Sequence, residues 1–148
     1  MITADTNVFV YLWDRDAPEK TAVARLVTGM LAERSGTLAL QVIGETQNVL
    51  RRKLRQPPWM AAQNARNLLI AFDCFAASEA NVSEALTLMA AGRLSYWDAL
   101  LVTAARDAGC HLMLSEDMQD GARFGDLEIV NPFGKTGPSE RFQALLTS

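Results

Sequence analysis

The sequence predicts an α/β fold, in which a parallel β-sheet carries helices on its faces. The main observation is that short apolar runs alternate along the chain with longer segments in which apolar residues recur at helical spacing. The second is composition: the chain has 148 residues, 49% hydrophobic and 21% charged, which suits one hydrophobic core. No internal repeat or low-complexity tract interrupts the pattern. We therefore expect one folded domain without intrinsic disorder.

Each predicted strand is a short apolar run, and most of the predicted helices fill the intervals between strands. The strands are expected at residues 1–4, 37–40, 74–76, 111–114 and 127–130, and the helices at residues 6–13, 19–34, 42–54, 59–72, 79–91 and 96–108. Pro18 precedes the second helix, and Gly92 and Gly109 follow the last two, in agreement with the usual helix boundaries. We expect a domain over residues 1–133 and a C-terminal tail over residues 134–148, with a short helix that starts at Ser139 and Glu140.

Composition and missing motifs exclude several classes of protein. No apolar run approaches the roughly 20 residues of a membrane helix, and the N-terminus has no basic segment before an apolar one, so we expect a cytoplasmic protein without a membrane partner. The net charge of −3 argues against a partner attracted by bulk positive charge. His111 is the only histidine, so a histidine-dependent triad has no convincing base, and no P-loop or Gly-x-Gly-x-x-Gly fingerprint is present. We expect Cys74 and Cys110 to be buried free thiols.

Four acidic residues lie near the carboxyl ends of predicted strands, where open parallel sheets bind their ligands. They are Asp5 after the first strand, Glu45 in the helix after the second, Asp98 at the start of the sixth helix and Asp117 after the fourth strand. Each has an ordinary alternative role, as a helix cap, a surface charge, a capping-box partner of Ser95 or a turn residue, respectively. One shared site explains all four together better than four unrelated local roles.

Asp98 is the most informative of the four. Its helical neighbours Leu101, Val102 and Ala105 are apolar, and a carboxylate on such a stripe is costly unless it is paired or bound to a metal. Four carboxylates about 5 Å apart would repel by ~3 kcal/mol per pair at an effective dielectric constant of about 20, which a divalent cation would relieve. A set of ligands made only of oxygens favours Mg²⁺ or Mn²⁺ over zinc.

Several segments together make the chain resemble the PIN-domain nucleases and, within them, the VapC-type toxins of bacterial toxin–antitoxin pairs. The resemblance extends from Met1 to about Phe133. It rests on residues 2–8, Glu45, residues 95–100, residues 114–121 and residues 129–133. Each segment alone is a weak indicator, but their order and spacing are specific. The resemblance implies a three-layer α/β/α fold with a central parallel sheet of about five strands.

The resemblance also implies an activity and a set of functional residues. It implies a metal-dependent endoribonuclease with four catalytic, metal-binding carboxylates, Asp5, Glu45, Asp98 and Asp117, that leaves 5′-phosphate and 3′-hydroxyl ends. Thr6, Asn7 and Ser115 would orient these ligands. Glu116 or Asp120 could share the role of Asp117, which we prefer because the family places its acid two residues after a Ser or Thr. A cognate antitoxin and a homodimer are also implied.

The surface that would bind RNA is less well defined. Arg52 lies seven positions after Glu45, nearly on the same helical stripe, so we expect it to contact the RNA substrate. For Trp59 and Trp97 we favour a core position over stacking on bases. The apolar residues of helices 19–34 and 59–72 fit either internal packing or a groove for an antitoxin helix.

Two other functions remain open. One is a non-catalytic PIN-like module that binds RNA or protein. The other is a phosphatase with an acidic pocket, although Asn7 stands where haloacid-dehalogenase-type phosphatases have a second aspartate.

Overall fold

The computed structural model describes all 148 residues of the chain. In chain order, its elements are β1 (Ile2–Ala4), α1 (Thr6–Val10), α2 (Pro18–Glu33), β2 (Thr37–Ala39), α3 (Leu40–Arg52), α4 (Pro58–Ala71), β3 (Asp73–Phe75), α5 (Glu79–Ala90), α6 (Tyr96–Asp107), β4 (Leu112–Leu114), β5 (Arg123–Phe124), β6 (Leu127–Val130) and α7 (Glu140–Thr147). No helix has the length and apolar character needed to cross a membrane.

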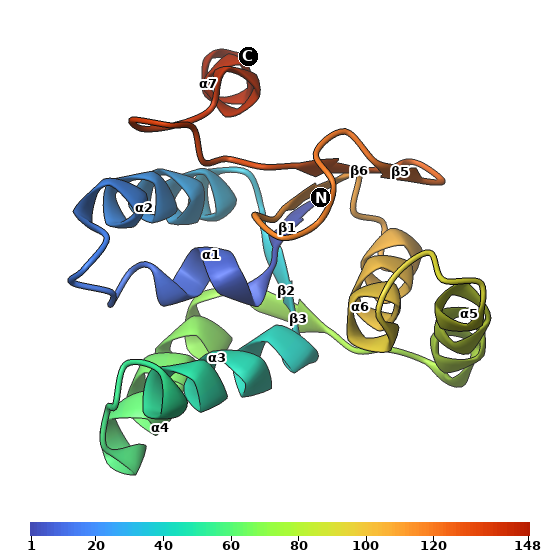
Figure 1. Cartoon of the computed structure of the whole chain (residues 1–148), viewed down its shortest axis with the longest axis horizontal. Helices are drawn as coiled ribbons and strands as arrows, with labels where there is room; N and C mark the ends of the chain where they lie inside the picture. Colours follow the sequence, from blue (N-terminus) through green and yellow to red (C-terminus); the bar gives the residue numbers. More distant parts are fainter.

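The strands form a layer between two groups of helices, which confirms the predicted α/β/α class. β1 pairs in parallel with β4, and β4 with β6, while β2 and β3 form a separate parallel pair next to β1. Helices α1 to α4 lie on one side of the strands, and α5 and α6 lie on the other (Figure 1). All five predicted strands are present, with ends that differ by at most one residue. The short β5, antiparallel to β6, was not predicted, because two residues carry no detectable periodicity.

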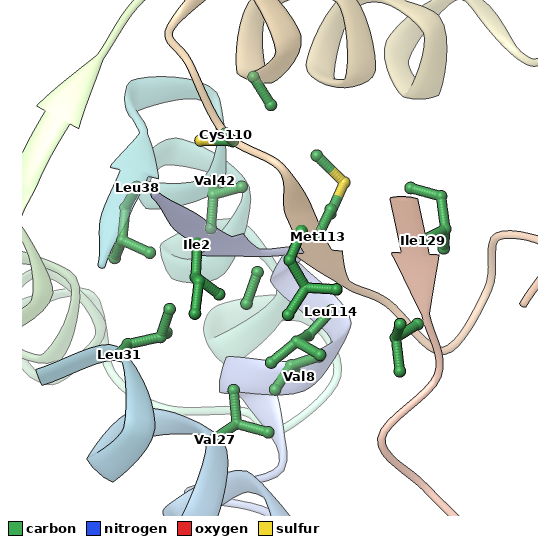
Figure 2. Close-up of a cluster of buried hydrophobic side chains, with 14 of the residues drawn as sticks. Ile2, Val8, Val27, Leu31, Leu38, Val42, Cys110, Met113, Leu114 and Ile129 are labelled. Carbon is green, nitrogen blue, oxygen red and sulfur yellow. The ribbon is translucent and has the colours of Figure 1, made fainter. Parts of the chain in front are cut away.

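The core lies between the strands and the helices that cover them. Strand residues Ile2, Leu38, Met113 and Ile129 belong to this core, together with Val27 of α2 (Figure 2). These side chains come from apolar runs without alternation, which is the pattern of strands covered on both faces. The core therefore anchors the strand ends from which the polar residues project.

The predicted helix ends are close to those observed, with one larger difference in α1. This helix was expected to reach Trp13 but ends at Val10, after which Leu12 and Trp13 donate to the carbonyls three residues earlier. The chain then crosses to α2. α3 begins at Leu40, directly after β2, two residues earlier than expected.

The expected core positions of the two tryptophans are wrong. Trp59 is 70% exposed and Trp97 is 61% exposed. Both lie in the first turn of a helix, α4 and α6 respectively, where the aromatic side chain points away from the packed layers. Both cysteines are free, as expected, but only Cys110 is buried, since Cys74 lies in β3, whose residues are partly exposed.

The C-terminal segment contains the expected short helix. Ser139 caps α7 by accepting a hydrogen bond from the Phe142 N–H at 3.2 Å. Phe142 is fully buried in the main core cluster, and Arg141 pairs with Asp120 and Glu128. Residues 140–147 are therefore packed against the domain rather than detached from it.

Candidate functional site

Asp5 lies at the centre of the candidate site, at the carboxyl end of β1. Its N–H donates to the Leu114 carbonyl of β4 at 2.9 Å, which extends the pairing of the two strands by one bond. Its side chain caps α1 by accepting a hydrogen bond from the Thr6 N–H at 2.7 Å. The second oxygen accepts hydrogen bonds from the Ser115 hydroxyl at 3.0 Å and the Asn7 amide at 3.3 Å. Asp5 is therefore buried and held on both oxygens.

Glu45 reaches the same region from the second turn of α3. Its Oε2 accepts a hydrogen bond from the Thr6 hydroxyl at 2.8 Å, so Thr6 contacts two of the predicted acids. Its Oε1 accepts a hydrogen bond from the Gln41 amide at 2.7 Å, and that amide also donates to the Trp97 carbonyl at 3.2 Å. Gln41 thus joins the start of α3 to the start of α6, where Asp98 lies.

Asp98 has the position at the start of α6 that the sequence indicates. Its N–H donates to the Ser95 hydroxyl at 3.2 Å, so Ser95 is the helix cap. No hydrogen bond returns from the Ser95 N–H to the Asp98 carboxylate, whereas the capping box at Ser78 in α5 has both bonds. Asp98 therefore lacks the reciprocal bond of a capping box, although the Ser95 side chain is close enough to lower the pKa of its carboxyl.

Asp117 is joined to Asp5 by Asn7, whose amide donates to Asp117 at 3.0 Å and to Asp5 at 3.3 Å. The two nearby alternatives have other partners. Glu116 pairs with Lys20 at 2.7 Å and accepts a hydrogen bond from the Tyr11 hydroxyl. Asp120 pairs with Arg141 at 2.8 Å and lies near α7. The geometry therefore favours Asp117 as the fourth acid of the cluster.

The four acids form a negatively charged cluster without a cationic partner. None of them takes part in any of the ion pairs of the structure. Burial raises the pKa of the Asp5 carboxyl to about 6, and repulsion from Asp98 and Glu45 contributes to the rise. Burial also raises the pKa of Asp98; hydrogen bonding with Ser95 opposes this rise, and repulsion from Asp117 and Glu45 adds to it. Asp5 and Asp98 are thus close enough to other acids of the cluster for repulsion to oppose their ionisation.

The donor set fits a hard divalent cation, although the side chains do not converge on one point. No three of the Asp, Glu, His and Cys groups are arranged to hold a metal ion. Their oxygens instead accept hydrogen bonds from neutral groups of Thr6, Asn7, Gln41 and Ser115. The cluster nevertheless contains only carboxylate oxygens and a buried acid that lacks a positive neighbour, which is the chemistry that Mg²⁺ and Mn²⁺ match.

Arg52 is exposed in the last turn of α3, away from the acids, and no ion pair holds it. Its contact with RNA remains a prediction. Gln41 is the residue that sequence reasoning missed. The signal was a polar side chain two residues after the end of a buried strand, which is where ligand-binding residues collect in parallel sheets.

The family model of the PIN domain matches residues 2–121, which include all four acids. The chain belongs to the PIN domain family. No curated protein sequence matches this PIN domain.

Solved structures with the same fold are distant in sequence. A toxin–antitoxin complex from Klebsiella pneumoniae aligns with a TM-score of 0.65 and 16% identity over 90% of this chain and 98% of the other. The sarcin–ricin loop cleaving toxin VapC20 of Mycobacterium tuberculosis aligns with a TM-score of 0.60 and 17% identity, over 79% of this chain and 90% of the other. Rickettsia felis VapBC2 bound to a promoter DNA fragment aligns with a TM-score of 0.62 and 15% identity, over 87% of this chain and 97% of the other. At such identities the likeness establishes the fold of this PIN domain.

The raised pKa of Asp5 predicts a specific dependence of stability on pH in the absence of metal. The folded PIN domain keeps the Asp5 proton up to about pH 6, whereas the ordinary value in an unfolded chain is 3.8. The folded state therefore binds more protons between these values, and the free energy of unfolding falls as pH rises through that window. Since one pKa unit corresponds to ~1.4 kcal/mol, Asp5 accounts for a fall of roughly 2 to 3 kcal/mol.

Urea unfolding at pH 4, 5, 6 and 7 in EDTA measures this effect. Asp5→Asn should remove most of the fall, because its amide does not titrate. Asp126→Asn is the matched control, since Asp126 is exposed and forms no ion pair. Equal pH profiles for wild type and Asp5→Asn would contradict the assignment.

Proposed function

We propose that this PIN domain is a divalent-metal-dependent endoribonuclease that acts as the toxin of a toxin–antitoxin pair. The observation that carries the proposal is the cluster of four carboxylates, none of which pairs with a cation. Thr6 and Asn7 join Asp5, Glu45 and Asp117 by hydrogen bonds, and Asp98 lies close enough to raise the pKa of Asp5 by repulsion. Carboxylates that are buried for purely structural reasons are usually paired with a cation, because burial penalises an uncompensated charge. A bound cation together with a phosphodiester would satisfy the cluster.

Asp5, Glu45, Asp98 and Asp117 would hold Mg²⁺ or Mn²⁺. When bound, such an ion supplies positive charge that lowers the pKa of an attacking water and stabilises the scissile phosphate. Asp5 is the fixed member, because both of its oxygens are held by hydrogen bonds. Asp117 is exposed and Asp98 half-buried, so these side chains have more room to turn toward an ion.

The remaining polar residues keep the acids in place. Thr6 donates to Asp5 and Glu45, Asn7 donates to Asp5 and Asp117, and the Ser115 hydroxyl donates to Asp5. Hydrogen bonds of this kind fix the orientation of a metal ligand and commonly affect metal affinity by 10- to 100-fold. We infer that Thr6, Asn7 and Ser115 are positioning residues for the acids.

The experiment that tests the nuclease is cleavage of RNA by the purified chain. Cleavage of single-stranded or looped RNA is expected with Mg²⁺ or Mn²⁺ and should disappear in excess EDTA, then return when metal is added back. Product ends should carry 5′-phosphates. Full activity in EDTA would reject the metal mechanism, and release of inorganic phosphate from small phosphate esters without RNA cleavage would favour the phosphatase. RNA binding without any cleavage would favour the non-catalytic module.

The toxin assignment rests on the structural neighbours that are toxins or toxin–antitoxin complexes. Four of the apolar residues considered for an antitoxin groove are buried in the core and cannot contact a partner helix: Val27, Met30, Leu31 and Leu68. The apolar side chains left exposed on α2 and α4 include Leu26, Trp59 and Leu69. An antitoxin and a second copy of the chain both remain proposed partners.

Expression in a bacterial host tests the toxin role. Induction of wild type alone should arrest growth, and co-expression of the small neighbouring gene product should restore it. Asp5→Asn, produced at the same level, is the control and should be harmless. Normal growth with abundant folded wild type would refute the toxin role while leaving the nuclease to be judged by the cleavage assay.

A further inference from the structure

A large groove with a positively charged lining lies at one end of the molecule. It has a volume of about 1110 Å³ and is formed by the α1–α2 and α3–α4 connections with the first two turns of α2 and α4. Figure 1 shows both connections at the left end of the molecule. The cations on its wall are Arg15, Arg25, Lys53 and Arg55, and we call it the basic groove.

The basic groove is positive within a protein whose formal net charge is −3. Its four cations are exposed, and none forms an ion pair. Two carboxylates, Asp14 and Asp16, also line it. Asp14 serves the local turn by accepting a hydrogen bond from the Asp16 N–H at 3.0 Å. The cations therefore outnumber the acids and are free to contact an anionic ligand.

Arg55 lies in the turn that ends α3. Its φ angle is +54°, in the left-handed region that favours glycine and is costly for other residues. The chain turns here after α3, where the Gln56 N–H donates to the Leu50 carbonyl at 3.0 Å. Glycine would make this turn with less strain, and the turn places Arg55 on the wall of the basic groove.

The basic groove is aligned with the acidic cluster through two helices. α1 begins at the Asp5 cap and leads to Trp13 and Arg15, while α3 carries Glu45 and ends beside Lys53. At 1.5 Å per residue, the eight residues from Glu45 to Lys53 span about 12 Å. A single strand with its scissile phosphate at the acids would reach the groove within a few nucleotides.

We propose that the basic groove binds the phosphate backbone of single-stranded RNA on one side of the cleavage position. The proposal rests on the nuclease function proposed above. Three of the four cations are arginines, whose planar guanidinium groups can contact phosphate oxygens in pairs. Only 5 of the 16 lining residues are hydrophobic, which suits a nucleic acid strand better than an amphipathic protein helix. Trp13 adds an aromatic surface for a base.

Binding can be measured without cleavage in an Asp5→Asn background with EDTA. The probe is a fluorescein-labelled, mixed-sequence 12-nucleotide RNA, titrated at several salt concentrations. Arg25→Ala combined with Arg55→Gly should weaken binding at least 10-fold and reduce the slope of log K against log salt by about 1.4, since each phosphate contact contributes ~0.7. The charge-matched control, Arg66→Ala with Lys135→Ala, changes two exposed cations outside the groove and should remain within twofold.

Two further readouts separate ligand binding from folding and from catalysis. Arg55→Gly should have a Tm no lower than wild type, because it removes the left-handed strain. With otherwise wild-type residues and Mg²⁺, the groove variant should lose about 10-fold in kcat/KM on the 12-nucleotide RNA but keep its activity on a dinucleotide that is too short to reach the groove.

Unchanged RNA affinity and salt slope in the groove variant would overturn the proposal. If that variant instead lost only its binding to a co-expressed antitoxin, the groove would be a protein-docking surface. If wild type cleaved no RNA but the groove variant still lost RNA affinity, the nuclease function would fail while the basic groove stood as an RNA site.

Discussion

Asp98→Asn is expected to reduce RNA cleavage by at least about 100-fold while leaving the fold intact. The change is nearly isosteric, and it removes one negative charge from a cluster in which Asp98 interacts with Glu45, Asp117 and Asp5. A neutral amide is a much weaker ligand for Mg²⁺ or Mn²⁺ than a carboxylate. Initial rates on one RNA substrate at saturating metal, with Asp126→Asn as the control, measure the loss. Near-normal rates in Asp98→Asn would remove this residue from the metal site.

The stability of the same variant separates a shared acidic site from a helix cap. In EDTA at neutral pH, Asp98→Asn should be more stable than wild type by ~1 kcal/mol, since it relieves repulsion in a partly exposed cluster. Added Mg²⁺ should raise the Tm of wild type more than that of the variant, because a ligand stabilises the state that binds it. A variant destabilised equally with EDTA and with Mg²⁺ would indicate that the side chain acts only as a cap.

Phe142→Ala should destabilise the protein by about 3 to 4 kcal/mol, the usual result of removing a large aromatic side chain from a packed core. Phe142 is fully buried and packs with residues of the main core cluster, although it lies beyond the predicted domain boundary at residue 133. Urea unfolding at neutral pH measures the change. Thr147→Ala alters an exposed residue of the same helix and should stay within about 0.5 kcal/mol of wild type.

The size of this effect decides how the C-terminal segment should be viewed. A loss of several kcal/mol would make α7 part of the cooperative unit, so that deletion of residues 134–148 would unfold the domain. A loss below about 1 kcal/mol would instead mark α7 as a peripheral tail whose buried contact is easily replaced.

The sequence alone determined the elements and the set of acids to consider. Apolar runs and their boundary residues located all five longer strands, because burial on both faces leaves a continuous apolar signal. Asp5 could be singled out because it directly follows such a run, and Asp98 because a carboxylate on an apolar helical stripe needs a reason. Asp117 lies three residues after another such run, and its preference over Glu116 and Asp120 came from the resemblance. These are local features, and the local sequence contains them.

Only the tertiary structure decided which side chains meet. It showed that Glu116 and Asp120 are paired with Lys20 and Arg141, which leaves Asp117 beside Asn7. It also showed that Trp59 and Trp97, in the first turns of α4 and α6, are exposed. Helical periodicity could not predict this, because it does not indicate where a helix extends beyond its neighbours.

The basic groove also depended on tertiary structure. Two of its cations come from the α1–α2 connection and α2, and two from the α3–α4 connection about 30 to 40 residues later in the chain. Each of these positions individually resembles an ordinary surface charge. Periodicity indicates which face of a single helix or strand is apolar. Which distant segments come into contact depends on how whole helices pack against the sheet. No single segment of the sequence contains that information.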